Sequence, residues 1–244
     1  MAWTWFHRLG SPPYIYRLAA RLTPWLGWAA GLLIVAGLFD GLVLAPPDYQ
    51  QGDGFRIIYV HVPCAWLSLM VYTWMGVAAA VGLIWRIKVA HAVAAACAPI
   101  GASFTAAALA TGMLWGKPMW GTYWVWTPRL TSELLLLFLY LGYMGLRSSF
   151  DDLQRADRAS AVLAVVGIVN VPIVHYSVVW WTDLHQGSSV SLTGSSIATS
   201  MLVPLLVSML GFTLYFGAIV LVRLRAEVLR RERTAAWVRE AVGA

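Results

Sequence analysis

The chain has 244 residues, of which 60% are hydrophobic and only 11% are charged. A soluble domain carries about 25% charged residues, so the composition excludes an ordinary soluble protein and indicates a chain whose main solvent is lipid. The net charge of +6 would suit a nucleic-acid-binding protein, but the positions of the basic residues favour a different role.

Six apolar segments are long enough to cross a bilayer, because a helix needs roughly 20 residues to span the hydrocarbon core. In chain order they are 25–45, 62–85, 92–114, 131–147, 159–181 and 200–222. The sequence therefore predicts an all-α, polytopic membrane protein with six transmembrane helices, forming a single domain over residues 1–244.

Lysine and arginine alternate between the two sides of these spans, and cytoplasmic loops are enriched in both residues. One side holds only Arg56, Lys117 and Arg129. The other side holds Arg8, Arg17, Arg21, Arg86, Lys88, Arg147, Arg155, Arg158, Arg223, Arg225, Arg230, Arg231, Arg233 and Arg239. We therefore expect the N- and C-termini, with a basic tail at 223–244, to be cytoplasmic. The positive charge then indicates membrane orientation.

The segments expected on the outer side are 46–61, 115–130 and 182–199. The second, WGKPMWGTYWVWTPRL, carries four tryptophans. Its glycines and Pro118 break helical spacing, so we expect a loop. An aromatic belt at the membrane interface is one interpretation, but a belt distributes single aromatics over the ends of many spans. The alternative is a platform for a large, flat, apolar ligand such as a porphyrin.

Histidines and arginines on the outer side fit that alternative. His61 lies where the first outer segment enters the second span, and His185 follows the fifth span. Neutral imidazole is a common haem ligand, and the guanidinium groups of Arg56 and Arg129 suit the haem propionates. His175, within the fifth span, is expected to be a packed, hydrogen-bonded residue.

Four other residues in the apolar segments have simpler interpretations. Asp40 and Glu133 are costly in lipid, but both lie near the outer ends of their spans, and we assign neither to the site. Cys64 and Cys97 are far apart in apolar runs. They are expected to be small buried side chains, forming neither a metal site nor a redox pair.

The stretch WGTYWVWT (120–127) resembles the tryptophan-rich WWD signature, roughly W-G-x-x-W-x-W-D, of the haem-handling proteins that mature c-type cytochromes. The flanking stretches PPDYQQGDGFRIIYVHVP, WGKPMWG, RLTSELLLLFLYLGY and VHYSVVWWTDLHQGSS look like the CcmC family, the six-span haem-handling subunit of the system I pathway. The resemblance covers the chain from about residue 45 to residue 190.

The resemblance implies that His61 and His185 are the axial ligands of a transiently bound, bis-histidine haem b. The platform it implies, within the periplasmic segment 115–130, comprises Trp115, Gly116, Trp120, Gly121, Trp124 and Trp126. It also implies delivery of haem to the periplasmic chaperone CcmE, at the bacterial inner membrane, by a CcmABCD-type ABC transporter complex that includes CcmA, CcmB and CcmD. CcmA is the ATPase of such a complex, and the sequence contains no P-loop.

One residue departs from the signature, which ends in Asp where this chain has Thr127. Thr127 followed by Pro128 is a favourable start for the fourth helix, although an anionic contact made by the Asp would be missing. Two rival functions stay open: a permease that moves haem through the bilayer, and a scaffold that binds haem only incidentally. A haem lyase is disfavoured because its relatives need many more spans, and no catalytic residues are apparent.

Overall fold

Six helical segments in the computed structural model are long and apolar enough to cross a membrane, which confirms the six predicted spans. The structure describes residues 8–181, 185, 190–191 and 194–242. The helices are α2 (Pro12–Phe39), α3 (Ile58–Trp85), α4 (Lys88–Trp120), α5 (Pro128–Ser148), α6 (Leu153–Gly167), α7 (Asn170–Trp180), α8 (Thr199–Arg231) and α9 (Ala236–Val242). A π-helix, Asp40–Leu44, extends α2, and a 3₁₀-helix, Asp53–Ile57, precedes α3.

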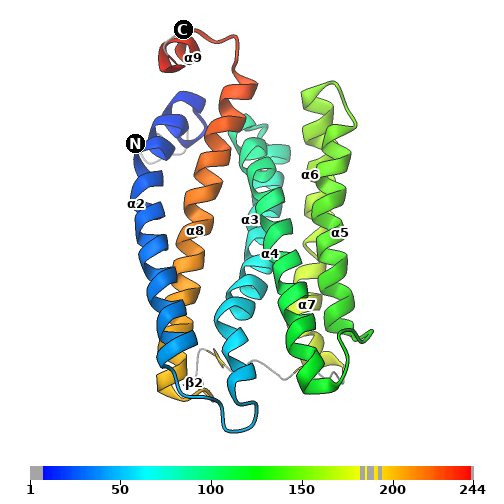
Figure 1. Ribbon diagram of the computed structural model, residues 1–244. Coiled ribbons are helices and arrows are strands. Elements are labelled where there is room, and N and C mark those ends of the chain that lie inside the picture. The colour runs from blue at the N-terminus through cyan, green and yellow to red at the C-terminus, as the bar shows by residue number, and fades with distance from the viewer. Residues whose placement is uncertain (1–7, 182–184, 186–189, 192–193, 243–244) are drawn as a thin grey trace.

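The long helices stand side by side in three groups (Figure 1). The largest interhelical contacts join α2 to α8 and α3 to α4, while α5 packs on α4, α6 and α7. Fully buried Leu67, Tyr72, Met75 and Tyr140 lie in the main core, at the α3, α4, α5 and α6 contacts. The α3–α4 pair therefore forms the centre of the bundle.

The start of α2 and the short helix α9 lie at the same end of the bundle (Figure 1). We call this the basic end, because Arg86, Lys88, Arg147 and Arg231 lie there. The opposite, aromatic end carries the α4–α5 connection and the antiparallel pair of two-residue strands, β1 (Val190–Ser191) and β2 (Gly194–Ser195). Which end faces the cytoplasm stays a prediction.

The expectation that residues 115–130 form a loop was wrong for 115–120, where α4 continues to Trp120. Pro118 removes only the hydrogen bond that its own N–H would have made to the Leu114 carbonyl. The helix ends at Gly121, whose φ of +77° is in the left-handed region and whose N–H donates to the Lys117 carbonyl at 3.0 Å. A glycine at this position forms a favourable helix C-terminus.

The fifth span is interrupted rather than continuous. Helix α6 ends at Gly167 and α7 begins at Asn170. Pro172 follows in the first turn of α7 and has no N–H to carry the hydrogen-bond ladder across the break. The buried amide of Asn170 donates to the Ser132 carbonyl at 2.9 Å, which joins the break to α5.

Candidate functional site

A cavity of about 350 Å³ lies at the aromatic end, within the usual size range of ligand pockets. Helices α3, α4 and α5 form most of its wall, and α7, the segment before the 3₁₀-helix and His185 complete it. The lining residues are Gln50, Gln51, His61, Ala65, Leu69, Ala108, Leu109, Gly112, Trp115, Met119, Trp120, Arg129, Leu130, Glu133, Val174 and His185.

Both predicted histidine ligands line this cavity, although 124 positions separate them in the sequence. The ring centroids of His61 and His185 are 6.5 Å apart, and the ring planes are inclined at 35°. Two imidazoles that share one metal ion, each at a metal–nitrogen distance of about 2 Å, have centroids about 6 Å apart. The separation therefore fits a pair of axial ligands.

His61 is held against α4 by a hydrogen bond and by close packing. Its Nδ1 lies 3.0 Å from the hydroxyl oxygen of Thr111, which itself donates to the Ala107 carbonyl at 2.7 Å. A Cβ on Gly112 would lie 3.1 Å from Cε1 of His61, so glycine permits this close approach. The imidazole is thus fixed on the wall of the cavity.

Trp115 packs beside His61. The two rings meet edge to face with centroids 5.6 Å apart, and Phe55 contacts the same indole at 6.1 Å. The indole N–H donates to Oε1 of Gln51 at 2.9 Å. Trp115 is therefore held from three sides and keeps His61 in place.

Trp120 lies beside the second histidine, and the ring centroids of Trp120 and His185 are 6.3 Å apart. A Cβ on Gly116 would lie 3.0 Å from the Trp120 indole, so this buried glycine makes room for the ring. Lys117 does not line the cavity: its Nζ donates to the Gly121 carbonyl at 3.0 Å and lies over the Tyr123 ring.

The four tryptophans of the predicted platform divide into two pairs. Trp115 and Trp120 line the cavity, whereas Trp124 and Trp126 pack edge to face on each other, 5.3 Å apart, outside it. Trp126 is 73% exposed. The division arises because the first pair lies on α4 and the second lies in the connection after Gly121.

The two predicted propionate partners also differ in position. Arg129, in the first turn of α5, lines the cavity. Arg56 does not: its side chain donates to the Gly41 carbonyl and to the Asp53 carboxylate, both at 2.9 Å. Arg56 thereby joins the 3₁₀-helix to the π-helix at the end of α2.

Glu133 is a lining residue that the sequence analysis left out of the site. It is buried, and its Oε1 has no hydrogen-bond partner among the described residues. It lies one helical turn after Arg129, on the same face of α5, and this spacing could have assigned it to the site from the sequence. Gln51, Thr111 and Gly112 were also missed.

Two further predictions have clear outcomes. The prediction that Thr127 starts the fourth helix is confirmed, because its hydroxyl accepts from the Leu130 N–H at 3.3 Å and Pro128 follows at the first helical position. The prediction of a packed His175 was wrong. This residue is exposed on α7 and contacts the Tyr176 ring edge to face, because it points away from the bundle core.

Six membrane-length helices define a polytopic membrane protein, and the cavity lined by two histidines and two tryptophans at one end is its candidate ligand site. The family model described as "Heme exporter protein C" matches residues 5–239. The chain belongs to this family, CcmC. It is a multi-pass protein of the bacterial inner membrane with a role in haem handling for c-type cytochrome biogenesis.

Similar proteins cover nearly the whole chain. "Heme exporter protein C" of Escherichia coli (strain K12) is 48% identical over 240 residues, which are 98% of this chain and 97% of that protein. The protein of the same name from Bradyrhizobium diazoefficiens is 50% identical over 224 residues, 91% of this chain and 85% of its own length. A "putative cytochrome c biosynthesis ccmC-like mitochondrial protein" of Marchantia polymorpha is 42% identical, over 81% of this chain and 84% of its own.

Proposed function

We propose that the chain holds haem b between His61 and His185 at the periplasmic face of the inner membrane and passes it to the haem chaperone CcmE. The observation that carries this proposal is the 6.5 Å separation of the two imidazoles across one cavity. Haem supplies an iron that takes one axial ligand on each of its faces.

The contacts of His61 support its role as a ligand. The only proton of the Thr111 hydroxyl is donated to the Ala107 carbonyl, so Thr111 accepts a hydrogen bond from Nδ1–H of His61. In this tautomer Nε2 carries the free lone pair and binds iron. Hydrogen bonds of this kind orient ligand histidines and increase their basicity.

The rest of the cavity is better suited to retaining haem than to catalysing oxygen chemistry on it. Two axial imidazoles leave no open coordination position, and the indoles of Trp115 and Trp120 supply apolar walls. Arg129 pairs with a propionate. Release requires the loss of at least one axial bond. We assign this loss to His185, which lies outside any helix, whereas His61 is part of α3.

The partners and the orientation complete the proposal. The excess of basic residues at one end favours a cytoplasmic basic end and therefore a periplasmic haem cavity. Relatives are named as parts of a haem exporter, and we propose that this chain works with CcmA, CcmB and CcmD in such a complex.

The absorption spectrum of the purified, haem-loaded chain tests the proposal. His61→Ala and His185→Ala should each abolish the bis-imidazole spectrum. His175→Ala is the matched control, because His175 is exposed and does not line the cavity. A bis-imidazole spectrum retained in both single variants would refute the ligand assignment. A wild-type chain that takes up no haem without partners would instead support the scaffold function.

A further inference from the structure

A second cavity, of about 700 Å³, lies at the basic end, far along the bundle from the haem site. The turn between α3 and α4, the start of α4, the start of α6 and the end of α8 enclose it. Nothing in the proposed haem function uses this cavity.

The cavity has an excess of positive charge. Arg86, Lys88 and Arg158 line it, and the side chain of none of the three forms an ion pair with another described residue. Among the described residues, Asp157 and Glu232 are the carboxylates that line the cavity. Asp157 is paired with Arg231, so Glu232 is the carboxylate that remains without an ion pair. Three cations therefore face one unpaired carboxylate.

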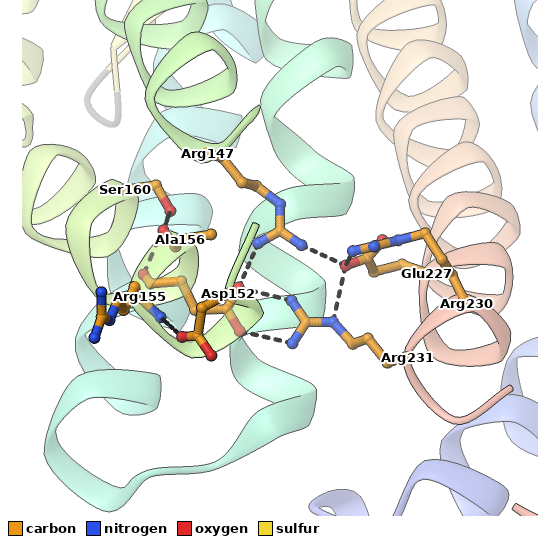
Figure 2. A network of polar contacts seen from close by, with 9 residues as sticks. Arg147, Asp152, Arg155, Ala156, Ser160, Glu227, Arg230 and Arg231 are labelled. Carbon is orange, nitrogen blue, oxygen red and sulfur yellow. Dashed lines mark hydrogen bonds and ion pairs between the residues drawn. The ribbon is translucent and has the colours of Figure 1, made fainter. Parts of the chain in front are cut away.

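The wall formed by α6 and α8 is a buried network of ion pairs (Figure 2). Arg147 and Arg231 both contact Asp157, and both donate to Glu227. The Arg230 guanidinium adds a third contact to Glu227 at 2.8 Å. The side chains of Arg231 and Asp157 are each 8% exposed. The network holds three guanidinium groups against two carboxylates, and Asp157 and Arg231 are the members of it that line the cavity.

The backbone at the cavity also favours an anion. Helix α4 begins at Lys88 without a side-chain cap and with no acidic residue in its first turn, and its first turn lines the cavity. The N–H groups of an uncapped helix start are donors with partial positive charge. Arg86 adopts φ 55° and ψ 34°, a conformation in which glycine is usual. Strained backbone of this kind is found at functional sites.

Part of the cavity wall is apolar. Leu83, Val89 and Val228 line it, and each belongs to a helix that continues into a membrane span. A ligand with a phosphate group above an acyl chain fits such a boundary, and basic pockets between membrane helices bind anionic lipid headgroups.

We propose that this cavity binds the phosphate-bearing headgroup of an anionic phospholipid. The headgroup contacts Arg86, Lys88 and Arg158 and the start of α4, and the acyl chains follow the apolar wall into the bilayer. The bound lipid joins α4, α6 and α8 at the end opposite the haem site.

Native mass spectrometry of the detergent-purified chain, titrated with phosphatidylglycerol or phosphatidylcholine, tests the proposal. The double variant Arg86→Gln/Arg158→Gln should bind phosphatidylglycerol roughly tenfold more weakly than the wild type. The matched control is Arg155→Gln/Arg223→Gln, which removes the same charge from exposed positions outside the cavity on α6 and α8. The control should bind as the wild type does, and phosphatidylcholine should bind weakly to all.

The variant Arg86→Gly distinguishes a loss of lipid binding from a loss of folded structure. Glycine adopts the left-handed conformation without strain, so this variant should unfold at the same temperature as the wild type or higher, and yet bind less phosphatidylglycerol. Equal binding by all variants, or equal loss in both double variants, would overturn the proposal. Equal binding of the two lipids would overturn it as well. Displacement of phosphatidylglycerol by inorganic phosphate, with no dependence on acyl chains, would assign the site to free phosphate instead.

Discussion

The hydroxyl oxygen of Thr111 lies 3.0 Å from Nδ1 of His61, and the same hydroxyl donates to the Ala107 carbonyl at 2.7 Å. A hydroxyl that donates its single proton to a backbone carbonyl can only accept from the imidazole, so this geometry favours a proton on Nδ1 of His61. Nε2 is then the ring nitrogen with a free lone pair. In the proposed haem site, Thr111 would therefore determine which atom of His61 binds iron.

Replacing Thr111 by valine should weaken haem binding by about tenfold, because the hydrogen bond that orients the ligand is lost. Haem titration followed by absorbance at the Soret band measures the change. Thr111→Ser keeps the acceptor and should stay close to the wild type. Equal affinities of the valine and serine variants would show that the tautomer is fixed by another group.

Trp115→Ala and Trp120→Ala should each lower haem affinity by about tenfold, because an aromatic contact contributes about 0.5–1.5 kcal/mol beyond its buried area. Trp126→Ala is the control for an exposed tryptophan outside the cavity. Its haem affinity should be nearly unchanged. If all three variants lose affinity equally, the platform extends beyond the cavity, as the resemblance alone implied.

Glu133→Met should raise the stability of the haem-free chain by about 1–2 kcal/mol, because a buried carboxyl oxygen with no hydrogen-bond partner among the described residues is replaced by an apolar group of similar length. Thermal unfolding in detergent measures this change, and haem titration of the same variant reports any loss of binding. A lower unfolding temperature would mean that the carboxyl group stabilises the fold.

Arg129→Gln should weaken haem binding by about tenfold, through loss of a charge-assisted contact with a propionate. Arg56→Gln should leave haem affinity nearly unchanged, since Arg56 contacts Gly41 and Asp53 outside the cavity. Methyl-esterified haem supplies the control: it should bind the wild type and the Arg129 variant equally. A greater loss from the Arg56 substitution would reverse the two assignments.

Asp157→Asn should destabilise the chain by about 3 kcal/mol, because Arg147 and Arg231 lose one of their two shared anionic partners and keep only Glu227. The unfolding temperature in detergent is the measurement. Asp151→Asn, at an exposed position before α6, should change stability by no more than about 0.5 kcal/mol. Similar unfolding temperatures for the two variants would show that the network contributes little.

The spans could be predicted from hydropathy because bilayer thickness sets a minimum apolar length. The third span was predicted too short, because 92–114 was expected and α4 covers Lys88–Trp120. The continuation of the last span into the basic tail, expected from the sequence, is confirmed as far as Arg231. Polar and aromatic residues that continue a helix beyond the apolar window leave no hydropathy signal. The break before Asn170 was missed because the residues on both sides of it are apolar, so hydropathy indicates one continuous span there.

The histidines and the first two tryptophans of the site could be predicted because their residue types suggest a chemistry. Thr111 could not, since its role depends on a contact with His61 across fifty positions of sequence. Gly112, Trp115 and Met119 lie at three- and four-residue spacing and share one face of α4, so helical periodicity could have grouped them had the helix been recognised beyond residue 114.

Helices α3 and α4 are joined by only two residues, Arg86 and Ile87. The proposed ligand His61, its partner Thr111 and the indoles of Trp115 and Trp120 all belong to this one helical hairpin. The other lining groups, His185 and the residues of α5, α7 and the segment before α3, reach the hairpin from elsewhere in the chain. In the proposed site, a displacement of those groups would therefore change one side of the haem contacts and leave the hairpin side in place.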